Sequence, residues 1–137
     1  MKLHDLKTWP ESFSAIWRGT KTHEVRVDDR GFEIGDHLLL REFTPCATCD
    51  GEGRLFQPIR PCCDAPHGHY TGAWVLARVT HVTPGGSFRL PVDLCVMSIR
   101  VDATSWATGD FDVQAVLDHL AGRASMDLDI VPRKQLP

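Results

Sequence analysis

The sequence lacks any long hydrophobic run. Its apolar stretches are only a few residues long, far short of the roughly 20 residues that cross a bilayer as a helix. The N-terminal stretch MKLHDLKTWPESF carries acidic side chains and no apolar segment of the kind found in signal peptides. We therefore expect a cytoplasmic protein with no membrane partner.

An excess of basic residues is also lacking. The chain has 15 Lys and Arg against 18 Asp and Glu, for a net charge of -3. Proteins that coat nucleic acid neutralise its phosphates with a basic surface, so the composition disfavours that class. It leaves room for a local basic cleft, or for a pocket that holds one nucleotide.

Internal repeats and low-complexity tracts are absent, and 137 residues is the usual size of one domain. Hydrophobic patterning predicts strands at 2–7, 21–29, 37–43, 73–82 and 93–101. A helix is expected over 9–19, since Pro10 suits a first helical turn and Gly19 a helix end. Many short strands with few helices indicate a mainly β or α+β fold, a small and partly open barrel with flanking helices.

The end of the chain has a different pattern. Val113, Val116, Leu117 and Leu120 recur with helical spacing within 109–124. We therefore expect a barrel domain at 1–102, interrupted by an insertion at 44–72, and a helical extension at 103–137.

The insertion holds four of the five cysteines, while Cys95 lies among apolar neighbours and is expected to be a buried core thiol. Cys46-x-x-Cys49 presents two thiolates from one tight turn, as a zinc knuckle does. The other two ligands must come from Cys62, Cys63, His67 and His69. Adjacent cysteines rarely bind one ion together, so one of them with His67 is expected, and a four-cysteine set is the alternative. Either set closes a structural Zn²⁺ site.

Other interpretations of the cysteines are weaker. CATCDGEG resembles the zinc knuckle of J-domain co-chaperones, but only one such unit is present. A redox pair would be expected within a thioredoxin-like βαβ pattern, which is missing here. PCATC also matches half of the zinc deaminase signature. The required H-x-E is absent, because His23 and Glu24 are adjacent.

The stretch GTKTHEVR at 19–26 gathers three charged side chains. In a strand, alternation places Glu24 and Arg26 on one face, together with Thr22. Lys21 has the opposite parity, so it can join them only from the turn before the strand. The stretch is either the wall of a pocket or a solvated strand edge carrying an ion-pair network.

Gly19-x-Lys21-x-x-Glu24-x-Arg26 resembles the G-x-K-x-x-E-x-R signature of the ASCH domain, a branch of the PUA-like β-barrels. Residues 2–43 and 70–101 resemble the opening and closing strands of a small microbial ASCH subfamily. The resemblance implies a PUA-like barrel whose cleft binds RNA or a nucleotide or nucleoside. It implies ligand contacts from Lys21 and Glu24, which are also the candidate catalytic residues. Arg26, Thr22 and Arg30 would complete the cleft.

Some ASCH relatives resemble amidohydrolases that remove an acetyl group from the N4 amine of cytidine. Those enzymes use a lysine and, three residues later, a threonine, whereas this chain has Lys21 and Glu24. Ribonuclease activity is a further possibility within the superfamily. The sequence thus favours a nucleotide- or RNA-binding module, with a small hydrolase as the alternative. A third hypothesis is an interaction protein that acts through its zinc segment or its C-terminal helix.

Overall fold

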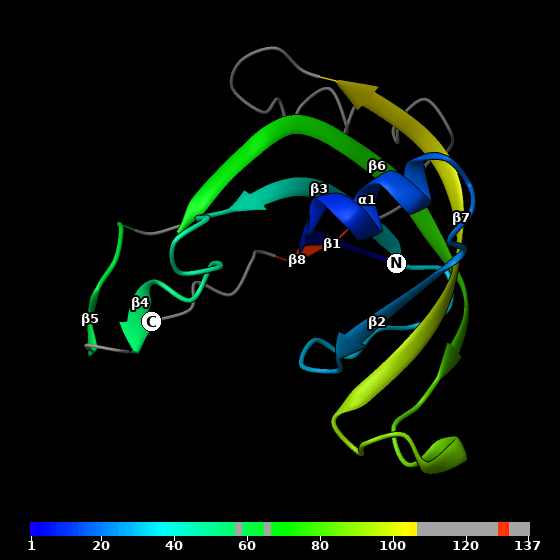
Figure 1. The fold of residues 1–137 in the computed structure, drawn as a ribbon. Coiled ribbons are helices and arrows are strands. Elements are labelled where there is room, and N and C mark those ends of the chain that lie inside the picture. The colour runs from blue at the N-terminus through cyan, green and yellow to red at the C-terminus, as the bar shows by residue number, and fades with distance from the viewer. Residues whose placement is uncertain (57–58, 65–66, 107–128, 132–137) are drawn as a thin grey trace.

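The computed structural model describes residues 1–56, 59–64, 67–106 and 129–131, and its largest element is a six-stranded sheet (Figure 1). The strand order is β2-β7-β6-β3-β1-β8. The strands are β1 (Lys2–Thr8), β2 (His23–Val27), β3 (His37–Pro45), β6 (Gly68–Thr83), β7 (Leu94–Trp106) and β8 (Asp129–Val131). β1 pairs in parallel with β3 and β8, and the other pairs are antiparallel. The expected mainly β architecture is confirmed.

The remaining elements are small. Helix α1 spans Pro10–Trp17, the 3-10 turn η1 spans Ser87–Arg89, and β4 (Arg54–Phe56) pairs with β5 (Ile59–Pro61) in a separate ribbon. The expected first helix is confirmed, with Pro10 in its first turn and Gly19 just beyond its end at φ +77°. None of the described helices is long and apolar enough to cross a membrane. The helix expected at 109–124 lies outside the described residues.

Three observed strands, β3, β6 and β7, extend past the expected segment boundaries. β7 continues to Trp106, beyond the boundary expected at residue 102. β3 and β6 form one long hairpin in which Thr44 pairs with His69 and Pro45 with Gly68. The cysteine segment is therefore the end of a hairpin, because the ladder runs into both sides of the expected insertion.

The sheet curls strongly along β6 and β7 (Figure 1). The register shifts between Leu76 and Ala77 and between Val79 and His81, and such bulges bend a strand and increase its twist. As a result β2, the first strand in the order, comes close to β1, the fifth. Within the described residues no backbone ladder joins these two strands, so the sheet remains open between them.

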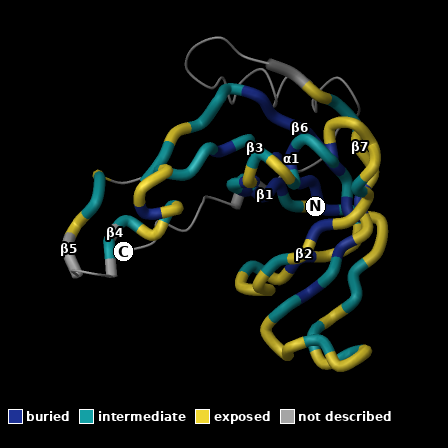
Figure 2. The backbone as a smooth tube through the Cα atoms, viewed as in Figure 1, coloured by how far each residue is buried: buried dark blue, intermediate teal, exposed yellow. Residues whose placement is uncertain are grey.

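The main core lies inside the curl, where α1 packs against the sheet. Phe13 and Ile16 of α1 are buried together with Leu6 of β1 and with Leu38 and Leu40 of β3. Figure 2 shows buried backbone along β1, β3 and β6 and a mostly exposed β6–β7 hairpin end. Cys95 is fully buried in this core, as expected, and desolvation raises the pKa of its thiol.

A buried polar pair fixes the loop before β3. His4 Nε2 and Asp36 Oδ2 lie 2.9 Å apart, and both side chains are almost fully buried. Asp36 also accepts hydrogen bonds from the backbone N–H groups of Lys2 and Glu33. Burial alone would raise the pKa of Asp36, but these hydrogen bonds and His4 outweigh it and hold that pKa below the ordinary 3.8.

We expect Asp36→Asn to lower the free energy of unfolding by about 1–3 kcal/mol, because a charged acceptor of several hydrogen bonds is lost. Since the pKa is lowered in the folded state, the contribution is present above about pH 4 and disappears as the pH falls through the folded-state value. Urea unfolding at pH 7 and near pH 3 measures this difference. Asp93→Asn, at an exposed position, is the control and should change little. A pH-independent difference between Asp36→Asn and wild type would contradict the assignment.

Candidate functional site

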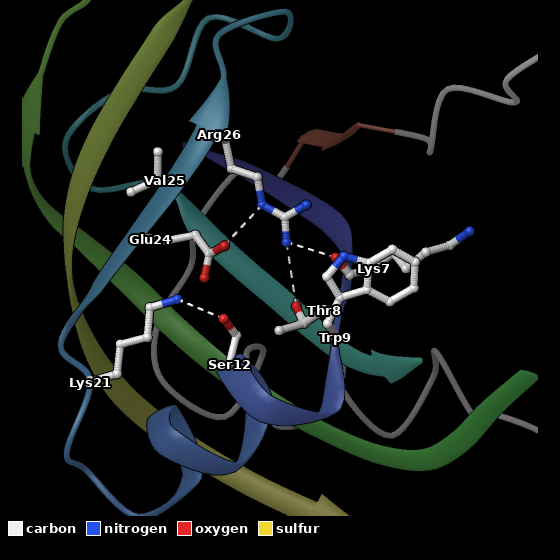
Figure 3. Close-up of a pocket in the computed structure, with 8 residues that line it drawn as sticks. All are labelled: Lys7, Thr8, Trp9, Ser12, Lys21, Glu24, Val25 and Arg26. Carbon is white, nitrogen blue, oxygen red and sulfur yellow. Dashed lines mark hydrogen bonds and ion pairs between the residues drawn. The ribbon is translucent and has the colours of Figure 1, made fainter. Parts of the chain in front are cut away.

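A cavity of about 320 Å³ lies where the end of β1, the start of α1 and strand β2 meet (Figure 3). Its wall combines cationic, acidic, hydroxyl and aromatic groups. The lining residues are Lys7, Thr8, Trp9, Ser12, Lys21, Glu24, Val25 and Arg26. Lys21, Glu24 and Arg26, the three charged residues singled out in the sequence, therefore meet at one pocket.

Strand β2 shows an inverted burial pattern. Glu24 is only 5% exposed, whereas Val25 and Val27 are 44% and 52% exposed. The charged face of this strand points inward, because the curl of the sheet turns it toward β1 (Figure 3). A solvated strand edge would show the opposite pattern, so the burial of this strand favours the pocket wall, although the ion pair of the alternative is present between Glu24 and Arg26.

Arg26 links the two strands that the sheet leaves unpaired. Its Nη2 donates to the backbone carbonyl of Lys7 at 2.7 Å and to Thr8 Oγ1 at 3.4 Å. Its Nε donates to Glu24 Oε1 at 3.1 Å. Arg26 is therefore both a wall of the pocket and a structural bridge to β1.

Only one of the two carboxylate oxygens of Glu24 has a hydrogen-bond partner among the described residues. Its Oε1 pairs with Arg26, but its buried Oε2 has no hydrogen-bond partner among the residues the structure describes. Lys21 sits on the other side of the carboxylate, and its Nζ donates to Ser12 Oγ at 2.9 Å (Figure 3). A buried carboxylate oxygen without a donor is costly, so its position in a pocket wall marks a place where a ligand N–H would be stabilised.

Two expected cleft residues lie elsewhere. Thr22 is exposed and does not line the cavity, and its carbonyl accepts from the backbone N–H of Ile99. Arg30 is also outside the lining. It donates to the Asp5 carbonyl at 3.0 Å and lies 3.7 Å from an oxygen of Asp29.

Sequence reasoning missed the half of the pocket contributed by the β1–α1 junction. That half consists of Lys7, Thr8, Trp9 and Ser12. The only signal was the Trp9-Pro10 pair, which predicted a helix start and nothing about a pocket. These residues face β2 because of the curl of the sheet, which no local pattern encodes.

The second cluster is formed by Cys46, Cys49, Cys62 and Cys63, whose sulfur atoms all lie within 4.8 Å of one another. Cys46 Sγ is 3.8 Å from Cys62 Sγ, and Cys49 Sγ is 3.6 Å from Cys63 Sγ. A tetrahedral ion with metal–sulfur bonds of about 2.3 Å needs sulfurs about 3.8 Å apart. The four thiols therefore fit a metal ion, and all five cysteines in the chain are free.

The thiols of this cluster differ in acidity. Backbone N–H groups of Cys49 and Thr48 lower the pKa of Cys46 to about 6, because they stabilise its thiolate. Desolvation, followed by the neighbouring sulfurs of Cys49 and Cys46, raises the pKa of Cys62 to about 11 and that of Cys63 to about 12. Cys46 is thus the thiol that loses its proton most easily, and a bound cation would displace the protons of Cys62 and Cys63.

The two candidate histidines take different positions. His67 Nδ1 lies 3.5 Å from Cys63 Sγ, beside the four sulfurs, while His69 is exposed on β6. Both Cys62 and Cys63 belong to the sulfur group, which matches the four-cysteine alternative rather than the set of three cysteines with His67. The backbone makes this possible, since Cys62 N donates to the Gly53 carbonyl and Cys46 N to the His67 carbonyl. These bonds bring the two ends of the segment together.

Comparison with known proteins gives two findings. Over 82 residues the chain is 30% identical to the protein described as "Uncharacterized 12.9 kDa protein in GpA 3'region" of Escherichia phage P2. The match covers 60% of this chain and 55% of the phage protein, so the chain spans just over half of that relative's length. A family model described as "Domain of unknown function (DUF3850)" matches residues 3–99, a range that contains the pocket and the cysteine cluster. The chain therefore belongs to the DUF3850 family.

Proposed function

We propose that the protein is a binding module for a nucleotide or for a nucleotide unit of RNA, held in the pocket by Lys21, Glu24 and Arg26. The observation that carries this proposal is the buried and unpartnered Oε2 of Glu24, set beside two cationic side chains. The ligand must therefore donate at least one hydrogen bond and also carry acceptors or negative charge.

A nucleotide meets these conditions better than simpler ligands do. A purely anionic ligand would be repelled by Glu24, and a purely cationic one by Lys21 and Arg26. A base offers amino or imino N–H groups to a carboxylate, while carbonyl or phosphate oxygens accept from lysine or arginine. The half-exposed ring of Trp9 adds an aromatic surface for a base.

The fold is compatible with the ASCH resemblance. The signature residues Gly19, Lys21, Glu24 and Arg26 join a helix end to a pocket wall. Arg26 and Arg30 bridge the gap between β2 and β1, as expected for a partly open barrel. We therefore propose a PUA-like barrel. The binding and product-formation experiments below distinguish a binding module from a hydrolase.

We further propose that the cysteine cluster holds a structural Zn²⁺. Four thiolates in tetrahedral spacing leave no open ligand position, which is the arrangement of structural rather than catalytic zinc. The bound ion would fix the end of the β3–β6 hairpin.

We expect Lys21→Ala and Glu24→Gln each to weaken binding by at least about tenfold, because each removes a contact that is largely shielded from water. The probes are nucleosides, nucleoside monophosphates and short single-stranded RNA, measured by calorimetry or fluorescence anisotropy. Arg26→Ala is a poorer test, since it also removes the bridge to the Lys7 carbonyl.

The matched control is Arg89→Ala, which deletes one positive charge at the exposed η1 turn, outside the pocket lining. It should bind as wild type does. The proposal fails if the wild type binds none of these probes, or if Lys21→Ala and Arg89→Ala bind equally well. Chromatography of the probes after incubation, with N4-acetylcytidine included, tests the hydrolase alternative by product formation.

Protein purified without chelators should contain about one zinc per chain. Cys46→Ser, Cys62→Ser and Cys63→Ser should each lose most of the metal, because the four sulfurs form one group. His67→Ala should keep it. Elemental analysis by mass spectrometry measures all four variants.

Cys95→Ala, which removes the one thiol outside the cluster, is the control and should retain the metal. Metal-free wild-type protein, or intact masses showing disulfides among the four cysteines, would refute the zinc site. Loss of metal in His67→Ala to the same extent as in Cys63→Ser would instead establish a three-cysteine, one-histidine set.

A further inference from the structure

The cysteine segment touches the wall of the pocket at Trp9. Gly51 follows the Cys46–Cys49 knuckle with φ +82°, and a Cβ added to it would lie 2.9 Å from Trp9 Cη2. The same Cβ would lie 3.4 Å from Pro45 Cβ. The backbone of the knuckle is therefore packed against the edge of the indole, at a distance that only glycine allows.

Trp9 also belongs to the pocket. It is 47% exposed and lines the cavity next to Thr8, at the junction of β1 and α1 (Figure 3). Its ring lies 5.7 Å from the Phe43 ring at 48°. The tryptophan thus contacts Phe43 and the knuckle backbone, lines the pocket, and keeps nearly half of its surface exposed.

The turn that contacts Trp9 is held by hydrogen bonds to Cys46 and Cys49. Gly53 N donates to Cys49 Sγ at 3.3 Å, and Asp50 N donates to the Cys46 carbonyl at 2.7 Å. The turn that carries Gly51 is therefore fastened to the same two cysteines that a metal would join to Cys62 and Cys63. Gly51 thus lies between this turn and the indole of Trp9.

We propose that the metal-bound knuckle positions Trp9, and that Trp9 is the platform on which the flat ring of the ligand stacks. This proposal rests on the proposed nucleotide function for its ligand, but the coupling between metal and tryptophan stands by itself. Stacking on an aromatic side chain tolerates any base, whereas Glu24 selects for a ring that presents an N–H group. The metal site would then set affinity without touching the ligand.

The coupling is tested on the full chain by nuclear magnetic resonance, with no ligand present. The chain has four tryptophans, and comparison with Trp9→Phe assigns the indole N–H signal of Trp9. Removing the metal with a chelator should shift or broaden this signal. The signal of Trp17, which packs on Phe13 in α1, should stay in place. An unchanged Trp9 signal, or equal changes at Trp9 and Trp17, would overturn the coupling.

A variant that keeps all four cysteines gives the second test. Gly51→Ala should move the Trp9 signal and weaken binding of nucleoside monophosphates by at least about threefold, because its Cβ would push the indole. Gly86→Ala is the matched control. Its φ of +84° imposes the same backbone strain, while its nearest neighbour is a Val92 methyl at 4.0 Å. If Gly51→Ala behaves like Gly86→Ala, the positioning role is wrong.

The platform itself is tested by Trp9→Ala and Trp9→Phe in the same titrations. We expect Trp9→Ala to weaken binding by about tenfold and Trp9→Phe to retain most of it, since either ring can stack on a base. Equal binding by Trp9→Ala and wild type overturns the platform. If the metal-bound wild type binds none of the nucleosides, nucleoside monophosphates and short RNAs, the proposed function fails, and the indole signals alone then decide the coupling.

Discussion

The arrangement of this protein depends on two arginines, Arg26 in β2 and Arg30 in the segment after it, that connect this part of the chain to β1. β8 pairs with β1 only from Lys2 to His4, and beyond that point the carbonyls of Asp5 and Lys7 accept from Arg30 and Arg26. Buried carbonyls need donors, and guanidinium groups supply them where a neighbouring strand does not. The curl of the sheet is thereby held without a continuous backbone ladder, and the space left between the strands is the pocket.

This connection explains why the charged residues of β2 face inward. Arg26 must point at β1 to reach the Lys7 carbonyl, and alternation then carries Glu24 to the same side. Burial of a carboxylate is tolerated because Arg26 pairs with one of its oxygens. The other oxygen has no hydrogen-bond donor among the residues that the structure describes, so the two oxygens of this side chain have different surroundings.

The cysteine cluster belongs to the same architecture, although it lies at the end of a hairpin. β3 and β6 carry the segment outward, and the four thiols bring its two ends back together. Because Phe43 and Pro45 on β3 lie near Trp9, the hairpin end meets the β1–α1 junction. The cysteine cluster and the pocket thus meet at one tryptophan, although about forty residues separate Trp9 from Cys46 and Cys49 in sequence.

Local patterns in the sequence determined the elements and the residue types of both sites. Hydrophobic periodicity, Pro10 and Gly19 predicted β1, β2, β3, β6, β7 and the first helix, and cysteine spacing predicted a group that could bind a metal, because these signals act over a few residues. Only the tertiary structure decided that Trp9 and Ser12 line the pocket, that Arg30 bridges strands, and that Cys62 and Cys63 join one cluster. The physical reason is that the bulges between β6 and β7 curl the sheet and bring β2 to β1. Such long-range proximity depends on the sum of many packing contacts and leaves no periodic trace in the chain.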